Sequence, residues 1–354
     1  MKFLDLFAGI GGFHLGMEQA GHKCVGWVEW DNFARKSYQA IYDVKGVWNA
    51  SDIRAVRADE LPRADCWCFG FPCQDISVAG KQKGITAGKR SSLFFTVTGL
   101  IRDLKEEDRP SYLLIENVKN LLSINGGFDF LKLQIELDEI GYDCEWDVLD
   151  SAEVVPQHRE RIFIIGHLRG RRTSKVFPIT EAYREANKQD GPVANTLTTR
   201  YSDSQGVGSY VVEGKSKSVE QVGNVMDVDY FSGNPQTGRV YDPQGISPTL
   251  STMQGGGREP KIIVNPHGFN HGGIKDISPT VTAGSFSDNT FVNNGIKVRK
   301  LTPRECWRLQ GFPDWAFNRA KEAGLSDSQL YKQAGNSVTV PVIKVIAERM
   351  KIID

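Results

Sequence analysis

The chain has 354 residues, of which 40% are hydrophobic, and 43 basic side chains balance 43 acidic ones to a formal net charge of zero. This composition can supply a substantial core for one large domain, or for a large domain with a smaller partner, and no apolar run reaches membrane-spanning length. Asp5 also interrupts any apolar start that would resemble a signal peptide. From both observations we expect a soluble cytoplasmic protein.

The first predicted elements are a strand over residues 2–7 and a helix over residues 13–20, joined by a tight turn over residues 8–12. Glycines at a strand-to-helix turn let a ligand approach backbone N–H groups, although many such turns serve only helix–strand packing. The spacing G-x-G-G differs from the dinucleotide fingerprint G-x-G-x-x-G. The turn alone therefore indicates a ligand site without identifying the ligand.

The next predicted strand, residues 24–28, ends in two residues that suit an adenosine group. Glu29 lies where an acid can accept hydrogen bonds from two ribose hydroxyls, and Trp30 offers a face on which a purine can stack. Asp52 and Ile53 follow at another expected strand end. Because nothing in this pattern provides a large pyrophosphate cradle, S-adenosylmethionine fits it better than NAD.

A fourth predicted strand, over residues 65–69, leads to Cys73. The polar, glycine-bearing residues 74–84 follow as a loop, so Cys73 sits where open α/β sheets hold reacting groups. A lone cysteine is more often a small buried hydrophobe, but the stiff Pro72 before it and the loop after it favour a nucleophile. The six cysteines are scattered without a zinc-binding pattern, which predicts reduced thiols and no metal site.

Two further segments carry polar side chains that we expect at the same edge of the sheet. The predicted strand 112–115 ends in Glu116, a candidate acid for which a surface or capping role is the alternative. Arg159 and Arg161 fall on one face of an extended segment, because side chains alternate along a strand. Paired arginines suit a phosphate or carbonyl oxygen, although a salt bridge is the usual outcome for arginine.

From residue 166 to residue 295 the sequence becomes rich in glycine, asparagine, serine and threonine, and it has a helix signal only in residues 180–188. This composition predicts an inserted β-rich domain. A degenerate repeat occurs three times in it, each time before a short predicted strand. Three related hairpins with exposed tips would explain the repeat, and coincidental turn chemistry is the alternative. The repeats are residues 195–198, 248–251 and 279–282, and the strands are residues 210–212, 262–264 and 291–292.

The C-terminal part returns to helix signals. Thr302 and Glu305 form a capping box at the start of a predicted helix that Gly311 ends. Residues 333–338 then lead into a second helix, which begins near Pro341.

Basic side chains gather in three clusters, although a net charge of zero argues by itself against a nucleic-acid-binding protein. Each cluster alone is typical of solvated surface, but their positions beside the Cys73 loop and at the edges of the insert favour a phosphate-binding surface. The clusters are Lys81, Lys83, Lys89 and Arg90; Arg169, Arg171, Arg172 and Lys175; and Lys297, Arg299, Lys300, Arg304 and Arg308.

Taken together, these segments make the chain resemble the DNA (cytosine-5) methyltransferases of the bacterial and phage restriction–modification type. The resemblance covers roughly residues 1–167 and 298–343 and keeps the family's usual order. The insert corresponds to the family's variable target-recognition region, so the DNA sequence read is not identified. The segments that carry the resemblance are Asp5-Leu6-Phe7-Ala8-Gly9-Ile10-Gly11-Gly12, Gly70-Phe71-Pro72-Cys73-Gln74, Glu116-Asn117-Val118, Gln157-His158-Arg159-Glu160-Arg161 and Gln333-Ala334-Gly335-Asn336-Ser337-Val338.

The resemblance implies a fold, a domain plan and partners. The fold is α/β, with the doubly wound, mixed but mostly parallel, Rossmann-like sheet of S-adenosylmethionine-dependent methyltransferases. Residues 1–170 and 298–354 would form the catalytic and cofactor-binding domain, and residues 171–297 a small β-rich target-recognition domain inserted into it. We expect a monomer that acts on double-stranded DNA, and any cognate restriction endonuclease would act separately.

The resemblance also implies the chemistry. The thiolate of Cys73 would attack C6 of cytosine, which makes C5 nucleophilic toward the methyl group of the cofactor. Glu116 would hold or protonate N3, and Asn117 would help to shape the pocket. Arg159 would contact O2, and Arg161 would position the active loop or the base. Because a base inside a duplex is inaccessible, the cytosine must be flipped out of the helix.

The expected cofactor residues would wrap the methionine part, bind the ribose and adenine, and close the pocket. They are Phe7, Gly9, Gly11, Glu29, Trp30, Asp52, Ile53, Pro72, Leu93, Asn336 and Ser337. The expected DNA contacts come from the loop after the nucleophile and from the predicted hairpin tips, where side chains can reach base edges. They are Gln74, Ser77, Lys81, Arg90, Thr196, Arg200, Thr249, Arg258 and Thr280.

Two departures from the family pattern put only loop and phosphate contacts in question: His158 stands where a Lys or Arg is frequent, and Ala79 where some relatives have Ser.

Two alternative functions stay open. One is methylation of tRNA cytosine, which one branch of the family performs, although the long insert and the Phe-Pro-Cys-Gln motif oppose it. The other is a catalytically silent DNA-binding regulator, which the complete set of expected catalytic residues opposes.

Overall fold

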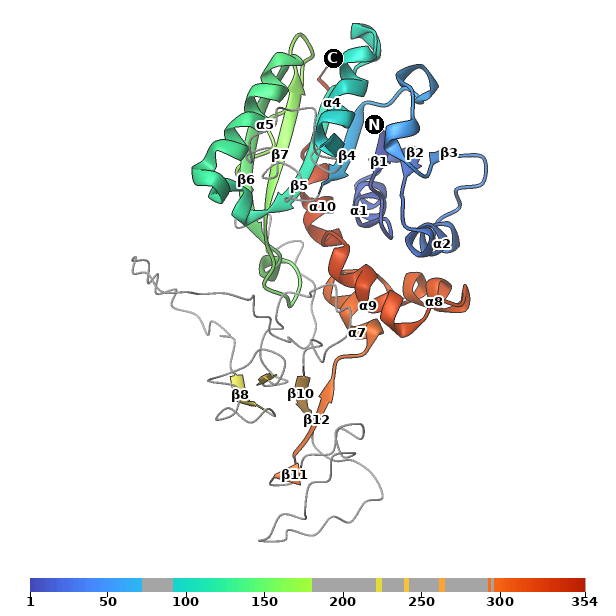
Figure 1. The fold of residues 1–354 in the computed structure, drawn as a ribbon, viewed down its shortest axis with the longest axis vertical. Coiled ribbons are helices and arrows are strands. Elements are labelled where there is room, and N and C mark those ends of the chain that lie inside the picture. Colours follow the sequence, from blue (N-terminus) through green and yellow to red (C-terminus); the bar gives the residue numbers. More distant parts are fainter. Residues whose placement is uncertain are drawn as a thin grey trace.

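The computed structural model describes residues 1–71, 92–179 and 301–353, and between the last two ranges only the course of five short strands. The elements form two sheets, a large one whose strands all lie within residues 2–168 and a small one whose strands lie within residues 221–300 (Figure 1). In the described ranges, none of the helices has both the length and the apolar character that a membrane span requires.

The large sheet has seven strands in the order β3-β2-β1-β4-β5-β7-β6. The strands from β3 to β5 run parallel, whereas β7 runs antiparallel to both β5 and β6. This topology confirms the predicted doubly wound, mostly parallel α/β fold. The chain order reverses between β1 and β4, where open α/β sheets bind their ligands. The strands are β1 (Lys2–Leu6), β2 (Lys23–Val28), β3 (Trp48–Ala50), β4 (Cys66–Gly70), β5 (Tyr112–Val118), β6 (Tyr142–Asp150) and β7 (Glu160–Leu168).

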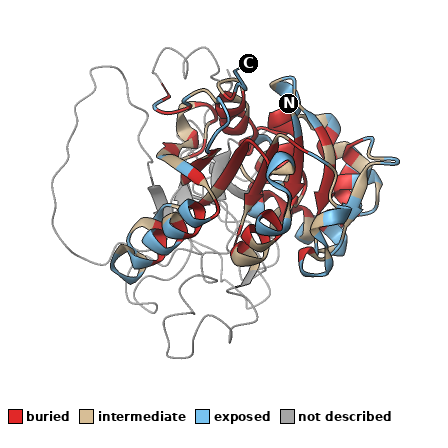
Figure 2. Ribbon diagram, turned by 90° about the horizontal axis from the view of Figure 1, so that it is seen from above, coloured by how far each residue is buried: buried red, intermediate tan, exposed pale blue. Residues whose placement is uncertain are grey.

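Helices cover both faces of this sheet, and alternate residues of each strand pack against opposite layers. In β1, Leu4 and Leu6 belong to the core beneath α4 and α5, whereas Phe3 belongs to the core beneath α1 and α10. Figure 2 shows the strands almost wholly buried between helices whose outer sides are exposed. The helices are α1 (Gly12–Gln19), α2 (Asn32–Ile41), α4 (Ser92–Asp103), α5 (Phe128–Glu139), α7 (Pro303–Leu309), α8 (Asp314–Glu322), α9 (Asp327–Asn336) and α10 (Val340–Ala347).

A third apolar cluster lies where α2, α7, α8 and α9 meet, around Trp27 and Trp307. The capping box predicted at the start of α7 is confirmed. The N–H of Thr302 donates to the Glu305 carboxylate (2.7 Å), and the N–H of Glu305 donates to the Thr302 hydroxyl (3.3 Å). Through this cluster the C-terminal helices pack onto the N-terminal half of the sheet.

The insert contributes the small sheet, whose strand order is β11-β12-β10-β9-β8. Its strands confirm a β-rich insert. Of the three strands predicted after the repeats, the one at residues 262–264 lies within β10, and the one at residues 291–292 shares only Val292 with β11. The third predicted strand, the repeats themselves and the helix signal at residues 180–188 lie outside the described residues. The strands are β8 (Gln221–Asn224), β9 (Arg239–Tyr241), β10 (Lys261–Val264), β11 (Val292–Asn293) and β12 (Ile296–Lys300).

Residues 171–179 pack with the large sheet, although the sequence assigns them to the insert. Val176 and Phe177 are buried in the cluster that contains Phe3 and α10. Thr173 also forms a β-bridge with Ile352 near the other end of the chain. The large domain therefore continues beyond residue 170, at least to residue 179.

Candidate active site

A cavity of about 670 Å³ opens at the carboxyl edge of the large sheet, a size typical of small-molecule sites. It lies where β1, β2, β4 and β5 end and where residues before β7 and α10 approach them. Many of the predicted site residues therefore meet in one place. Those that line it are Phe7, Gly9, Glu29, Trp30, Leu93, Glu116, Asn117, Arg159, Arg161, Asn336 and Ser337.

The three glycines of the β1–α1 turn, Gly9, Gly11 and Gly12, have different neighbours. A Cβ placed on Gly9 would meet no atom within 4 Å, so this residue is open, and it lines the cavity. Gly11, at φ 81°, does not line the cavity, because its Cβ position lies against the ring of Tyr42. Gly12 lies against Ser337 and Val338, where α1 closely approaches the segment before α10. Gly11 thus serves packing, Gly9 serves the cavity, and Gly12 serves both, because it also lines the cavity.

Glu29 holds a fixed carboxylate at the end of β2. Its Oε2 accepts a hydrogen bond from the N–H of Gly9 (2.7 Å), and its Oε1 accepts one from the N–H of Asp31 (2.6 Å). Burial raises the pKa of Glu29, and these backbone donors oppose that effect. Two oriented carboxylate oxygens beside the glycine turn can accept hydrogen bonds from a pair of hydroxyl groups.

Trp30 offers an aromatic face at the mouth of the cavity, with 67% of the residue exposed. The guanidinium of Arg54 lies 5.0 Å from the centroid of its ring. Arg54 also binds the Asp52 carboxylate through Nε (2.9 Å) and Nη2 (2.8 Å). Asp52 and Ile53 do not line the cavity: Asp52 connects with Trp30 through Arg54, and Ile53 is buried in the core.

Glu116 and Asn117 end β5 beside the segment that leads toward Cys73. Gly70 pairs with Glu116 in the β4–β5 register. The Asn117 side chain donates to the carbonyl of Phe71 (2.9 Å), which fixes the backbone directly before Pro72. Arg161 places Nε 3.1 Å from the Glu116 carboxylate, so the salt bridge expected as its alternative role is present within the cavity lining.

Arg159 has a structural role that the sequence does not reveal. Its Nη2 donates to the carbonyls of Gly335 (3.1 Å) and Ser337 (2.9 Å) and so ties the residues before β7 to those before α10. Burial, together with repulsion from Arg161, lowers the pKa of Arg159 to about 9. The guanidinium is therefore still charged at neutral pH, and the two carbonyls compensate part of the cost of burying it.

His158 is half-buried next to Arg159, with Nδ1 2.6 Å from the Asp150 carboxylate. This hydrogen bond raises the pKa of His158 and favours the imidazolium. The pairing therefore favours a cation at a position where the family that the sequence resembles often has a Lys or Arg.

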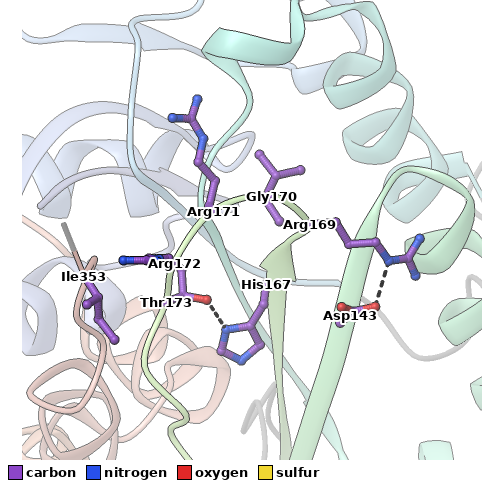
Figure 3. Close-up of a pocket in the computed structure, with 9 residues that line it drawn as sticks. Asp143, His167, Arg169, Gly170, Arg171, Arg172, Thr173 and Ile353 are labelled. Atoms are coloured by element: carbon purple, nitrogen blue, oxygen red, sulfur yellow. Dashed lines mark hydrogen bonds and ion pairs between the residues drawn. The ribbon is translucent and has the colours of Figure 1, made fainter.

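The second basic cluster lies away from the cavity. In the β5–β7 register, Val118 at the carboxyl edge pairs with Arg161, whereas His167 pairs with Tyr112 at the opposite edge. Arg169 follows there and forms ion pairs with Asp138 and Asp143. Arg169, Arg171 and Arg172 line a second pocket, of about 510 Å³, at this opposite edge. Figure 3 shows their side chains pointing in different directions. The second cluster therefore lies at the sheet edge opposite the cavity, and whether it shares a phosphate-binding surface with the Cys73 loop stays a prediction, because that loop is outside the described residues.

The described part of the third cluster is partly neutralised, because Arg304 and Arg308 both pair with Asp314. The first cluster lies outside the described residues. Several predicted site residues lie outside them too, namely Pro72, Cys73, Gln74, Ser77, Lys81, Arg90, Thr196, Arg200, Thr249, Arg258 and Thr280.

Other residues line the cavity without having been predicted. Most are sequence neighbours of predicted ones and contribute backbone or apolar surface. The sequence could have predicted some of them, since small residues in both the turn and the 333–338 segment indicate that these two backbones approach each other closely. They are Ala8, Gly12, Phe13, Gly70, Phe71, Val118, Gly335 and Val338.

Comparison with known proteins gives matches along the whole chain. Residues 1–352 match the family model described as C-5 cytosine-specific DNA methylase. The chain is 32% identical over 443 residues to the orphan methyltransferase M.SPBetaI of Bacillus phage SPbeta, covering 99% of this chain and 97% of that protein. It is 31% identical over 353 residues to the type II methyltransferase M.HhaI of Haemophilus parahaemolyticus, covering 98% and 93%. The solved structure of the S. pombe Dnmt2 methyltransferase shares the fold, with a TM-score of 0.61 and 18% identity over 98% of this chain and 96% of that one.

Proposed function

Because the chain belongs to the C-5 cytosine-specific DNA methylase family, we propose that its cavity binds S-adenosylmethionine and that Cys73 is the catalytic nucleophile. The protein is an enzyme that methylates carbon 5 of a flipped-out cytosine in DNA. This membership opposes a silent DNA-binding regulator, and it favours DNA over tRNA as the substrate. The observation that supports the proposed site is that the glycine turn, Glu29 and Glu116 all line one cavity.

The residues around the cavity fit S-adenosylmethionine. Gly9 leaves open space beside the turn, so a ligand can approach the backbone there. The Glu29 carboxylate, held by two N–H groups, suits the ribose hydroxyls, and the exposed face of Trp30 suits the adenine. When bound, the cofactor supplies an electrophilic methyl group. Asn336 and Ser337, held through Arg159, would close the pocket.

The proposed chemistry begins with the thiolate of Cys73. Its sulfur forms a bond to C6 of the cytosine, which makes C5 an enamine-like nucleophile. Once C5 is methylated, the C5 proton leaves to a base and the C6–S bond breaks, which regenerates the thiolate. Asn117 supports this role because it holds the carbonyl of Phe71, two residues before the nucleophile.

Glu116 would stabilise the ring at N3 as charge develops there. Its position at the end of β5, paired with Gly70 at the end of β4, supports this role. Arg161 orients the Glu116 carboxylate through their ion pair. Such preorganised groups lower the barrier because they need not reorient during the reaction.

Recognition of the DNA sequence is assigned in this proposal to the insert, residues 171–297. Residues 171–179, at the start of the insert, pack with the large sheet and would anchor the insert to it. Exchange of residues 180–297 for those of a relative is expected to change the sequence that is methylated. Unchanged specificity would remove the insert from the recognition role.

The experiment that tests the function offers S-adenosylmethionine with a labelled methyl group to the purified protein, with duplex DNA in one reaction and tRNA in another. We expect label in DNA alone. Label in tRNA alone would overturn the proposed substrate. Bisulfite sequencing of DNA from cells that express the protein would then identify the target cytosine.

A further inference from the structure

Tyr42, which follows α2, contacts the glycine turn from the side opposite the cavity. It is buried, with 7% of the residue exposed, and it is not part of the cavity lining. A Cβ on Gly11 would come within 2.3 Å of its ring. The ring therefore fills the space that the absence of a side chain on Gly11 creates.

The hydroxyl of Tyr42 anchors two carbonyls of this turn. It donates to the carbonyl of Gly11 at 2.7 Å, and the carbonyl of Ile10 lies at 3.2 Å as a second acceptor. The Gly11 carbonyl also accepts the N–H of Leu15, the first bond of α1. On the other side of the turn, Glu29 accepts the N–H of Gly9. The turn is therefore held at both ends by side chains from other elements.

Neighbouring aromatic rings fix the ring of Tyr42. The imidazole of His14 stacks on it, with centroids 3.9 Å apart and an angle of 12°. Tyr38 packs against both rings and shares a hydrogen bond with Nδ1 of His14. Because these rings are buried, Tyr42 has little freedom to move, and its hydroxyl is a rigid support for the turn.

We propose that Tyr42 is a positioning residue for the cofactor: its hydroxyl holds the Ile10 and Gly11 carbonyls on the protein side of the turn, so that the N–H groups of the first residues of α1 face the cavity. Gly12 and Phe13, at the start of α1, line that cavity. Carbonyl oxygens turned toward it would repel an anionic group of the ligand, whereas N–H groups at a helix start attract one. The inference rests on the proposed cofactor site and identifies a residue outside it that determines its affinity.

The test compares Tyr42→Phe with Tyr142→Phe. Both changes remove a buried hydroxyl that donates to backbone, but Tyr142 donates to Pro110, away from the cavity. We expect Tyr42→Phe to raise the KM for S-adenosylmethionine by about five- to tenfold and to leave kcat at saturation within about twofold. Calorimetry with S-adenosylhomocysteine, without DNA or turnover, should show the same loss of affinity. Tyr142→Phe should bind as the wild type does.

The outcomes separate this inference from the proposed function. Wild-type protein that fails to bind S-adenosylhomocysteine would overturn the cofactor site itself. Normal binding by both the wild type and Tyr42→Phe would overturn only the role of Tyr42. An equal loss in Tyr42→Phe and Tyr142→Phe would assign the effect to general destabilisation and would also overturn it. Hydrogen exchange gives a second measurement, because the amides of residues 9–12 should exchange faster in Tyr42→Phe alone.

Discussion

Nη2 of Arg159 lies 2.9 Å from the carbonyl oxygen of Ser337 and so connects residues that are 178 positions apart in the chain. Asn336 and Ser337 line the cavity, and Arg159 is the buried side chain that holds their backbone. The cavity wall therefore depends on a contact between the two outer parts of the chain, which the insert separates in sequence.

Replacement of Arg159 by Lys should weaken this connection. Both carbonyls are bound by Nη2, and the ammonium of a lysine ends a stem of different shape and lacks the rigid plane that places this nitrogen, so the two buried contacts lengthen or are lost. We expect the free energy of unfolding to fall by about 1–3 kcal/mol and the KM for S-adenosylmethionine to rise. Thermal unfolding and initial rates measure the two effects. The control is Arg169→Lys, whose exposed ion pairs at the opposite edge should matter little; equal losses in both variants would contradict the prediction.

Glu29 should make cofactor binding depend on pH. Burial raises its pKa above the ordinary value of 4.5, and binding of ribose hydroxyls favours the ionised form. Affinity for S-adenosylhomocysteine should therefore fall as the pH falls through this raised pKa, and recover as the pH rises. The pKa of Asp52 is lowered by its hydrogen bond with Arg54, so Asp52 stays ionised across this window. Calorimetry between about pH 5 and pH 8 measures the effect.

The variant Glu29→Gln tests the assignment, because burial also raises the pKa of Asp5, which lies in the neighbouring strand. The variant should bind about tenfold more weakly and lose the pH dependence. If the dependence persists in Glu29→Gln, another group such as Asp5 titrates, and the prediction for Glu29 is wrong.

Arg54 should support the adenine end of the site, although it does not line the cavity. It contacts the face of Trp30 and orients the Asp52 carboxylate. Arg54→Ala should weaken binding of S-adenosylhomocysteine about two- to fivefold. Arg57→Ala is a matched control, since Arg57 forms the same type of pair with Asp59 at an exposed position. If both variants bind like the wild type, Arg54 has no part in the site.

Much of the site could be predicted because parallel strands bring their carboxyl ends to one edge of the sheet. Glu29, at the end of β2, and Glu116, at the end of β5, were placed correctly by this rule, and both line the cavity. The capping box at Thr302 was predictable for a similar reason, since both partners lie within one helical turn.

Other features depend on contacts between residues far apart in sequence, and local patterns do not specify those. Tyr42 binds Gly11 across 31 positions, and Arg159 binds Gly335 across 176. The direction in which Gly11 faces, toward Tyr42 and not the cavity, follows from the same packing. The position of the second basic cluster depends on strand direction in the same way, because β7 runs antiparallel to β5 and so carries Arg169 to the edge opposite the cavity.

Cys73 lies outside the described residues, but the other cysteines sharpen the prediction for it. Burial raises the pKa of Cys24 and of Cys144 to about 12, so neither thiol readily forms a thiolate at neutral pH. Cys73→Ser should lower kcat at least about a thousandfold, because a serine hydroxyl is a poor nucleophile toward C6, while DNA binding should be largely retained. Methyl transfer and gel-shift assays measure the two properties.

Cys144→Ser is the matched control, since it removes a partly buried thiol from β6 and should remain active. Duplex DNA with 5-fluorocytosine at the target gives a direct readout. A base cannot remove the C5 fluorine as it removes the C5 proton, so the elimination that breaks the C6–S bond is blocked and the enzyme stays bonded to C6. Wild type and Cys144→Ser should form this denaturant-resistant complex in the presence of S-adenosylmethionine, with residue 73 as the attached position, and Cys73→Ser should not. Substantial turnover by Cys73→Ser, or attachment at another residue, would rule out the covalent route through Cys73.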